Sequence, residues 1–218
     1  MRLLSGQKTD NMKRYLLFLF IGVAFFSCKK REEDCTCPAP VTPVSTSANS
    51  YLQLGIGNYW IYDQYTIDTN SVEMLTGQDS AYVWGDTVIN GNTYYKFYDL
   101  YMTHILRDSA GFIIDTSSYK YFTNSIFNIP VTFYYWNNLG YSQAMTLSSP
   151  VAVTVPAGAY FAYDWQTTVH LTDPNYPWNP IRYGHSYFAY GVGKVKESYL
   201  FLNSPNSYER RLIRYHIQ

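Results

Sequence analysis

Residues Ala81 to Tyr101 read AYVWGDTVINGNTYYKFYDLY and contain the strongest hairpin signal in the chain. Two runs rich in aromatic and β-branched residues, Ala81–Ile89 and Thr93–Tyr101, are separated by Asn90-Gly91. Such residues favour a pleated, half-buried strand, and an Asn-Gly pair between two such runs favours a tight hairpin turn. The stretch therefore predicts two antiparallel neighbours in a sheet.

The same pattern recurs on both sides of this hairpin, with turn residues at short intervals. A longer turn is predicted at Asp108–Gly111, and helical periodicity is weak throughout, with a short helix considered only near Thr123–Ile129. We expect an all-β fold, a single antiparallel twisted sheet that forms a closed or half-open barrel with little helix. The further predicted strands are Tyr59–Ile67, Ile105–Arg107, Phe112–Asp115, Tyr119–Phe122, Thr132–Trp136, Val151–Val155, Ala159–Val169, Ser186–Tyr190, Lys194–Phe201 and Arg211–Ile217.

The N-terminus carries the parts of a secretory signal. Lys13 and Arg14 precede the apolar run Tyr15–Phe26, which a small residue, Ser27, separates from Cys28. The run is shorter than the roughly 20 residues that a membrane-spanning helix needs. We therefore expect a signal peptide over residues 1–27, with a possible upstream extension before an initiator Met12.

The end of this signal, Phe25-Phe26-Ser27-Cys28, resembles the lipobox of Bacteroidota lipoproteins, although Phe25 stands where Leu is usual. The resemblance implies that Cys28 is lipidated and becomes the N-terminus, which would anchor the protein to a membrane. The alternative is an ordinary signal peptide in which Cys28 has no role.

The segment after Cys28 predicts a flexible tether and a signal for localisation in the cell envelope. Lys29–Asp34 partly resembles the surface-export signal of Bacteroidota, and the alternative is a solvated charge run. Position 29 is Lys, so the Asp familiar from inner-membrane retention is absent. We expect lipid anchoring in the outer membrane, with surface exposure favoured. Pro38–Ser50 has a linker composition, so residues 28–50 form a flexible tether and residues 51–218 a β-rich domain.

Charge and cysteine content narrow the function classes. Removing residues 1–27 leaves 12 basic and 15 acidic side chains, and no basic patch is evident, so nucleic acid is not an expected partner. Cys35 and Cys37 lie too close for an unstrained disulfide and have no histidine nearby, so neither a metal site nor a catalytic role is expected. No cofactor is expected.

Several short motifs occur in this order along the chain: the opening Gly57–Trp60, the hairpin Asn90-Gly91, the turn Pro156–Phe161 and Gly191–Val195. Together they resemble the motifs of uncharacterised exported β-proteins, including TapB-like ones, although the turn has one residue more than usual. The resemblance implies a β-rich, partly open barrel without assigned catalytic residues. Physically, Pro156 and Gly158 suit a turn, while Gly191 and Gly193 indicate a bulge or a close backbone approach. A phosphate loop is disfavoured because the glycines open a strand.

Candidate catalytic groups are scattered along the sequence. His104, His170, His185 and His216 are far apart and are expected at the surface or on edge strands, and no metal site is predicted. Ser186 follows His185, but neighbours on a strand point to opposite faces, so a catalytic triad is unsupported. A glycosidase pair could be drawn from four carboxylates, although a structural role is the more ordinary expectation. They are Asp63, Asp99, Asp164 and Glu197.

The high content of aromatic residues is the sequence feature that most suggests a function, namely ligand binding. Tyr134, Tyr135 and Trp136 form one candidate ligand-binding platform, and Tyr176 with Trp178 in a Pro- and Asn-rich loop forms another; core packing is the alternative. We favour a non-enzymatic binding or assembly module for a glycan, a lipid-like ligand or an envelope protein. A hydrolase of cell-surface polysaccharide and a purely structural envelope lipoprotein remain alternatives.

Overall fold

The structure is a computed structural model that describes residues 47–136, 141–171, 180–201 and 204–218. Within these residues, thirteen strands join in one antiparallel sheet, preceded by one short helix, which confirms the predicted fold class. The elements are α1 (Asn49–Leu52), β1 (Tyr59–Ile67), β2 (Glu73–Ile89), β3 (Asn92–Asp99), β4 (Met102–Ser109), β5 (Phe112–Asp115), β6 (Lys120–Thr123), β7 (Pro130–Trp136), β8 (Tyr141–Leu147), β9 (Val151–Val155), β10 (Gly158–Leu171), β11 (Ile181–Ala189), β12 (Gly193–Leu200) and β13 (Ser207–His216).

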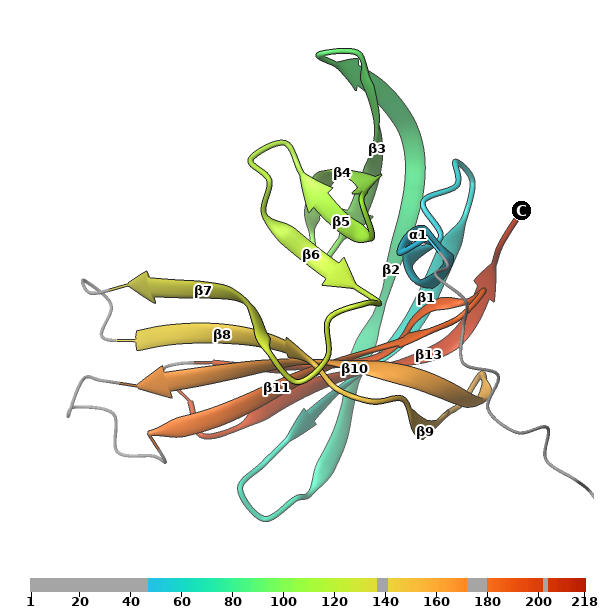
Figure 1. Ribbon diagram of the computed structural model, residues 1–218. Helices are drawn as coiled ribbons and strands as arrows, with labels where there is room; N and C mark the ends of the chain where they lie inside the picture. Colours follow the sequence, from blue (N-terminus) through green and yellow to red (C-terminus); the bar gives the residue numbers. More distant parts are fainter. Residues whose placement is uncertain (1–46, 137–140, 172–179, 202–203) are drawn as a thin grey trace, which may run out of the picture. The chain divides into compact units, whose positions relative to one another are not determined.

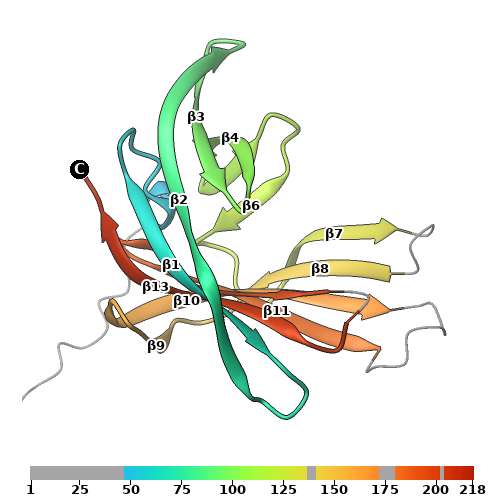
Figure 2. The same cartoon turned by 180° about the vertical axis from the view of Figure 1, so that it is seen from behind.

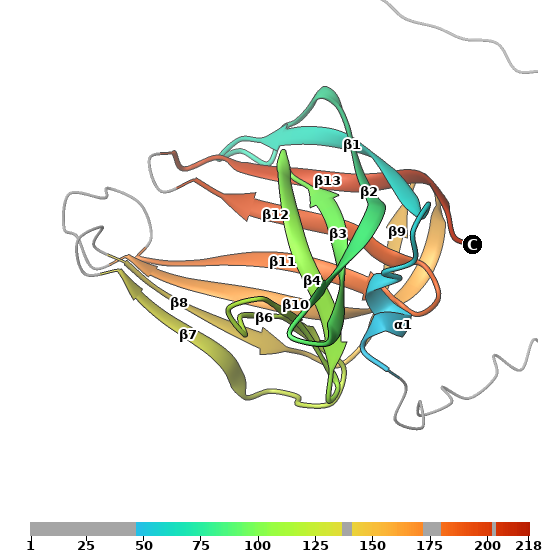
Figure 3. The same ribbon diagram turned by 90° about the horizontal axis from the view of Figure 1, so that it is seen from above.

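The sheet is curled on itself. Its strand order is β6-β5-β4-β3-β2-β1-β13-β12-β11-β10-β8-β7, with β9 paired to β10 beside this path. β1 therefore pairs with the last strand, β13, while β2, β3 and β4 fold over the layer made by β1, β13, β12, β11 and β10 (Figures 1 and 3). β6 and β7 are the two ends of this order, so the barrel keeps an unsealed seam and is half open.

Alternation along the strands builds the core. On β2, Ala81 and Val83 are buried whereas Tyr82 and Trp84 are exposed, as the period-2 geometry of a strand requires. The folded-over strands pack on the opposite layer through rings: Phe122 of β6 lies 4.5 Å from Phe188 of β11 between centroids. Figure 2 shows the same arrangement from behind, with β6 facing the layer of β10 and β11. Side-chain packing thus closes the interior where backbone pairing does not.

The turns predicted at Asn90-Gly91 and Pro156–Gly158 are confirmed, whereas the longer turn predicted at Asp108–Gly111 is a two-residue turn, because Asp108 and Ser109 pair with β5. Asn90 and Gly91 have φ of 50° and 75° between β2 and β3, which suits the predicted hairpin. Gly158, with φ of 142°, follows Pro156 between β9 and β10. Gly193 has φ of 106°, and a Cβ there would lie 2.8 Å from Trp60 Nε1. The expected close approach at Gly193 is therefore made by the Trp60 indole.

The local expectations differ from the structure in several places, and β4, β11 and β13 each begin three to five residues earlier than predicted. The short helix near Thr123–Ile129 does not form; β6 ends at Thr123, and Phe127 makes an isolated bridge to Leu147. β8 was not predicted because YSQAMTL is poor in β-branched residues, and it is a strand because β10 and β7 pair with it on both sides. β2 begins at Glu73 instead of Ala81, since its first half pairs with β1 despite its turn-like residues.

The chain enters the sheet through α1, which spans the predicted boundary between tether and domain. Ala48, Tyr51 and Leu52 are buried at this end of the domain, and the Gly191 amide donates to the Ser50 carbonyl at 2.8 Å. Among the described residues, no helix has the length and apolar character needed to cross a membrane.

Candidate functional site

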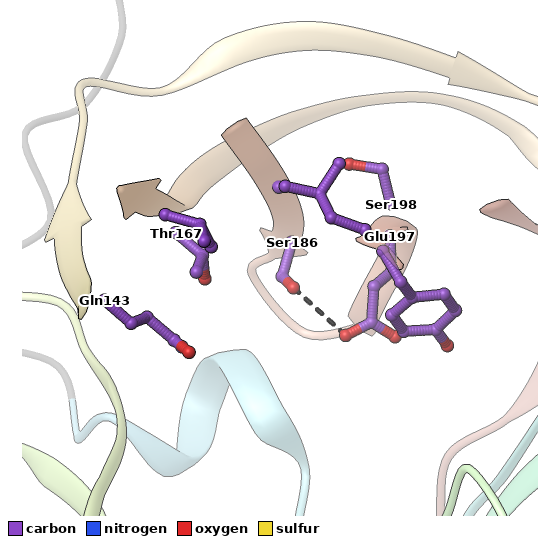
Figure 4. Close-up of a pocket in the computed structure, with 9 residues that line it drawn as sticks. Gln143, Thr167, Ser186, Glu197 and Ser198 are labelled. Atoms are coloured by element: carbon purple, nitrogen blue, oxygen red, sulfur yellow. Dashed lines mark hydrogen bonds between the residues drawn. The ribbon is translucent and has the colours of Figure 1, made fainter. Parts of the chain in front are cut away.

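A pocket of about 200 Å³ lies on the face of the sheet formed by β8, β10, β11 and β12. The side chains of Gln143, Thr167 and Ser186 surround a common space in Figure 4, with Glu197 beside Ser186. The pocket is small compared with sites for drug-sized ligands, which are typically some 300–1,000 Å³, and suits a monosaccharide-sized group. Its lining consists of Gln143, Thr167, Val169, Gly184, Ser186, Glu197, Ser198, Tyr199 and Leu200.

Strand register brings these residues together. Thr167 of β10 is paired with Gly184 of β11, and Ser186 of β11 is paired with Glu197 of β12. Directly opposite residues share a face of the sheet, so these side chains converge although they are far apart in sequence. Gly184 leaves room, because a Cβ there would lie 3.2 Å from the Ser198 carbonyl oxygen and 3.7 Å from Thr167 Cβ.

One wall of the pocket is a carboxylate held by its neighbours. Ser186 Oγ donates to Glu197 Oε1 at 3.1 Å, which is the dashed contact in Figure 4. The other oxygen, Glu197 Oε2, accepts from Lys194 Nζ at 2.8 Å and from Arg210 Nη1 at 3.1 Å. Glu197 therefore joins the pocket to an ion network in the interior.

The ion network consists of Asp79, Asp99, Glu197, Lys194 and Arg210, drawn from β2, β3, β12 and β13. Asp99 bridges the two cations, with Lys194 Nζ at 2.7 Å from Oδ2 and Arg210 Nη1 at 2.7 Å from Oδ1. Asp79 Oδ1 lies 2.9 Å from Arg210 Nη2. Arg210 is 1% exposed, so its charge is compensated by these carboxylates alone among the described residues.

Burial and charge act in opposite directions on these groups. Burial alone raises the pKa of Asp99, but Lys194 and Arg210 outweigh it and hold this pKa at about 2. Burial lowers the pKa of Lys194, but Asp99 and Glu197 raise it by more than burial lowers it, so the net shift is upward. Asp99 and Lys194 are therefore both charged at neutral pH.

Two tyrosines shield the network. Arg210 stacks over the Tyr62 ring at 4.2 Å, and the Tyr62 hydroxyl donates to the Lys194 carbonyl at 2.8 Å. The Tyr199 ring lines the pocket, while its buried hydroxyl makes no hydrogen bond of ordinary geometry within the described residues. Burial raises the pKa of both phenols, so both are neutral hydrogen-bonding groups at physiological pH.

The opposite face of the sheet holds a separate pair. His185 Nδ1 lies 2.9 Å from Asp164 Oδ2, and the His185 ring stacks on Tyr187 with centroids 5.9 Å apart. Ser186, the next residue, is engaged with Glu197 at the pocket. The expectation that His185 and Ser186 belong to no common triad agrees with these contacts.

The structure brings together only part of the predicted candidate set. Of the four carboxylates, Asp99 and Glu197 meet in the network, Asp164 pairs with His185, and Asp63 accepts from Gln78 Nε2 at 2.8 Å.

The histidine expectation needs a correction. His170 and His216 are exposed, but His104 is half-buried beside Tyr121, which hydrogen-bonds its ring, and His185 is bound by Asp164. Burial lowers the pKa of His104, so it is neutral at physiological pH. No group of three His, Cys, Asp or Glu side chains in the described part of the chain is arranged to hold a metal ion.

The predicted aromatic platforms are only partly placed. Tyr134, Tyr135 and Trp136 lie in β7, where Tyr134 is in register with Gln143, a residue that lines the pocket. Tyr176 and Trp178, like the predicted lipidation site Cys28 and the pair Cys35 and Cys37, lie outside the described residues.

Sequence reasoning did not single out Lys194, Arg210 and Asp79 as a set. A signal was present at Lys194, a charged residue that opens a predicted strand, whereas Asp79 and Arg210 lie just before the predicted strands Ala81–Ile89 and Arg211–Ile217. A charge at an inward position of a strand requires a buried partner. Which partner it finds depends on how distant strands pair.

Comparison with known proteins gives only distant likenesses. No family model and no curated protein matches the sequence. Two solved structures have a similar course of the chain, and each match covers 76% of this chain and 98% of the chain in the solved structure. One is a protein classed as exported, with a YmcC-like fold, from Bacteroides fragilis NCTC 9343, at 13% identity and a TM-score of 0.43. The other is a protein classed as a lipoprotein from Parabacteroides distasonis ATCC 8503, at 12% identity and a TM-score of 0.41. Likeness at this level leaves the function to be argued from the pocket and the sequence themselves.

Proposed function

We propose that the protein is an exported lipoprotein, anchored in the outer membrane through Cys28, whose half-open barrel is a non-enzymatic module that binds a glycan. The anchor and address are supported by the signal-like N-terminus, the lipobox resemblance and the charged tether. Exposure at the cell surface is part of this proposal, supported by the Lys29–Asp34 segment.

The observation that carries the binding role is the chemistry of the pocket wall. Gln143, Thr167, Ser186 and Glu197 offer amide, hydroxyl and carboxylate groups around a space of about 200 Å³. Sugar hydroxyls need donors and acceptors of this kind, whereas a lipid-like ligand needs an apolar lining. The polar wall differs from the aromatic platforms that the sequence predicted, and it favours a glycan over a lipid.

A polysaccharide hydrolase is supported less well. Asp99 and Glu197 are near each other, but both are bound by Lys194 and Arg210. A glycosidase needs one carboxyl group with a raised pKa that can donate a proton. The pKa of Asp99 is held at about 2, and Asp99 is 4% exposed and does not line the pocket.

The binding role is tested by filling the pocket. The full-length protein, purified in a detergent without a sugar headgroup, is titrated calorimetrically with neutral hexoses, amino hexoses and N-acetylated hexoses. Thr167→Leu places apolar bulk in the pocket, and Thr168→Leu makes the same change at the next residue, on the opposite face of β10.

We expect at least one sugar to bind to the wild type and to Thr168→Leu, and to bind at least tenfold more weakly to Thr167→Leu. Equal weakening by both substitutions would show that the pocket is not the site. Fatty acids binding in place of every sugar would also overturn the proposal.

The anchor is tested separately. Radiolabelled palmitate fed to cells that express the gene should enter the wild-type protein and not the Cys28→Ala variant. Cell fractionation should then place the labelled protein with the outer membrane. Equal labelling of both proteins, or none of either, would contradict the lipidated N-terminus.

A further inference from the structure

The ion network behind the pocket has an unbalanced charge. It combines three carboxylates, on Asp79, Asp99 and Glu197, with two cations, on Lys194 and Arg210. The formal balance is therefore one negative charge, in a region where the side chains are at most 10% exposed. Water screens such a charge poorly, so it acts strongly on whatever occupies the adjoining space.

Glu197 is the member of the network that also lines the pocket. Its Oε2 is occupied by both cations, whereas Oε1 has the Ser186 hydroxyl, at 3.1 Å, as its one hydrogen-bond partner within the described residues. An ionised carboxyl group has about four acceptor sites on its two oxygens. Accepting capacity therefore remains at Oε1, on the side that faces the pocket.

The other residues that line the pocket also favour a positively charged group that donates hydrogen bonds. No Lys or Arg side chain is among the described residues that line the pocket, and Gln143, Thr167 and Ser186 can all accept a hydrogen bond. An anionic group would be repelled by Glu197, and a neutral hydroxyl would leave the negative charge without a counterion. A cation with several N–H donors satisfies both the charge and the acceptors.

We infer that the pocket binds a protonated amine carried on a hydroxylated ring, as in an amino sugar, with the ammonium group against Glu197 Oε1 and the ring hydroxyls toward Thr167 and Gln143. The inference rests on the proposed glycan-binding function and names the class of glycan.

The test compares three sugars of similar size on the wild-type full chain in a detergent without a sugar headgroup. Glucosamine carries the ammonium group, glucose replaces it with a hydroxyl, and N-acetylglucosamine replaces it with a neutral amide. Binding is followed by the amide resonance of Gly184, which lines the pocket, with Gly91 in the β2–β3 turn as a control signal. We expect glucosamine to bind at least tenfold more tightly than either neutral sugar, and to shift Gly184 but not Gly91.

A second arm uses Glu197→Gln, which keeps the shape of the wall and removes the charge. In this variant glucosamine should bind no more tightly than glucose. The comparison of sugars on the wild type does not depend on whether this variant folds. If the three sugars shift Gly184 with similar affinity, the amine preference is wrong while glycan binding stands. If none shifts Gly184 at tens of millimolar, the proposed function fails as well.

Discussion

Replacing Arg210 with Met tests whether the ion network holds the curled sheet together. Arg210 lies on β13 and contacts Asp79, Asp99 and Glu197, from β2, β3 and β12. Methionine retains much of the aliphatic length of arginine, and it removes the charge, every N–H donor and the guanidinium that stacks over Tyr62. Lys194 then remains as the only cation in contact with the network's carboxylates in the described structure.

The expected loss is large because the remaining charges cannot reach water. The substitution changes the formal balance of the network from one negative charge to two, with Asp99 4% and Glu197 8% exposed. Removing one partner of a buried ion pair typically costs about 3–5 kcal/mol. Domains of this size are stable by roughly 5–15 kcal/mol, so the variant should keep only part of its stability.

The assay is urea denaturation followed by tryptophan fluorescence, because Trp60 and Trp165 are buried in the core. We expect a lower midpoint with an unchanged slope, and a fall in melting temperature of roughly 6–20 °C. Arg214→Met is the matched control on the same strand, since Arg214 is exposed, and it should change stability by less than about 0.5 kcal/mol. Equal effects of the two substitutions would refute the structural role of the network.

Three further predictions concern separate parts of the fold. The pKa of Asp99 is about 2 in the folded chain against the usual 3.8 of an aspartate, so its ion pairs should contribute about 2 kcal/mol above pH 4 and lose it between pH 4 and pH 2; the urea midpoints of Asp99→Asn and the wild type should converge over that range, and a constant gap would contradict the assignment. Arg182 donates to the carbonyls of Phe201, Ser204, Pro205 and Asn206 at 2.7–3.2 Å, so Arg182→Met should speed hydrogen exchange at the amides of Ser204, Asn206 and Ser207 by about tenfold while β1 is unaffected; uniform acceleration would show global loosening instead. Gly193→Ala should lower the urea midpoint more than Gly91→Ala, because both positions have positive φ but only Gly193 also lies against Trp60; equal shifts would mean that the contact with Trp60 relaxes without cost.

Much of the fold could be predicted because it depends on local chemistry. β1, β5 and β9 begin and end where their aromatic and β-branched runs do, and Asn90-Gly91 makes its turn as such pairs do. β8 could not be predicted, because its strand state comes from pairing with β10 and β7 and not from its own residues. The position of the seam between β6 and β7 also follows from which distant strands pair, and no local pattern specifies that pairing.

The candidate site was harder to predict for the same reason. Asp99 and Glu197 were recognised as candidate carboxylates, but their meeting depends on β3 folding over β12, which no local pattern specifies. Gly184 could not be singled out from the sequence, because what matters is that it has no side chain at the position opposite Thr167. The proposed anchor is a different kind of prediction, because export machinery recognises a signal peptide and a lipobox as linear sequence.

A crystal structure of the protein soaked with glucosamine would show whether a sugar occupies the space between Thr167 and Glu197. We expect a single ordered sugar in the pocket, with its amine nitrogen within about 3.2 Å of Glu197 Oε1. An empty pocket at saturating glucosamine, or a sugar bound only on another face of the sheet, would contradict this expectation.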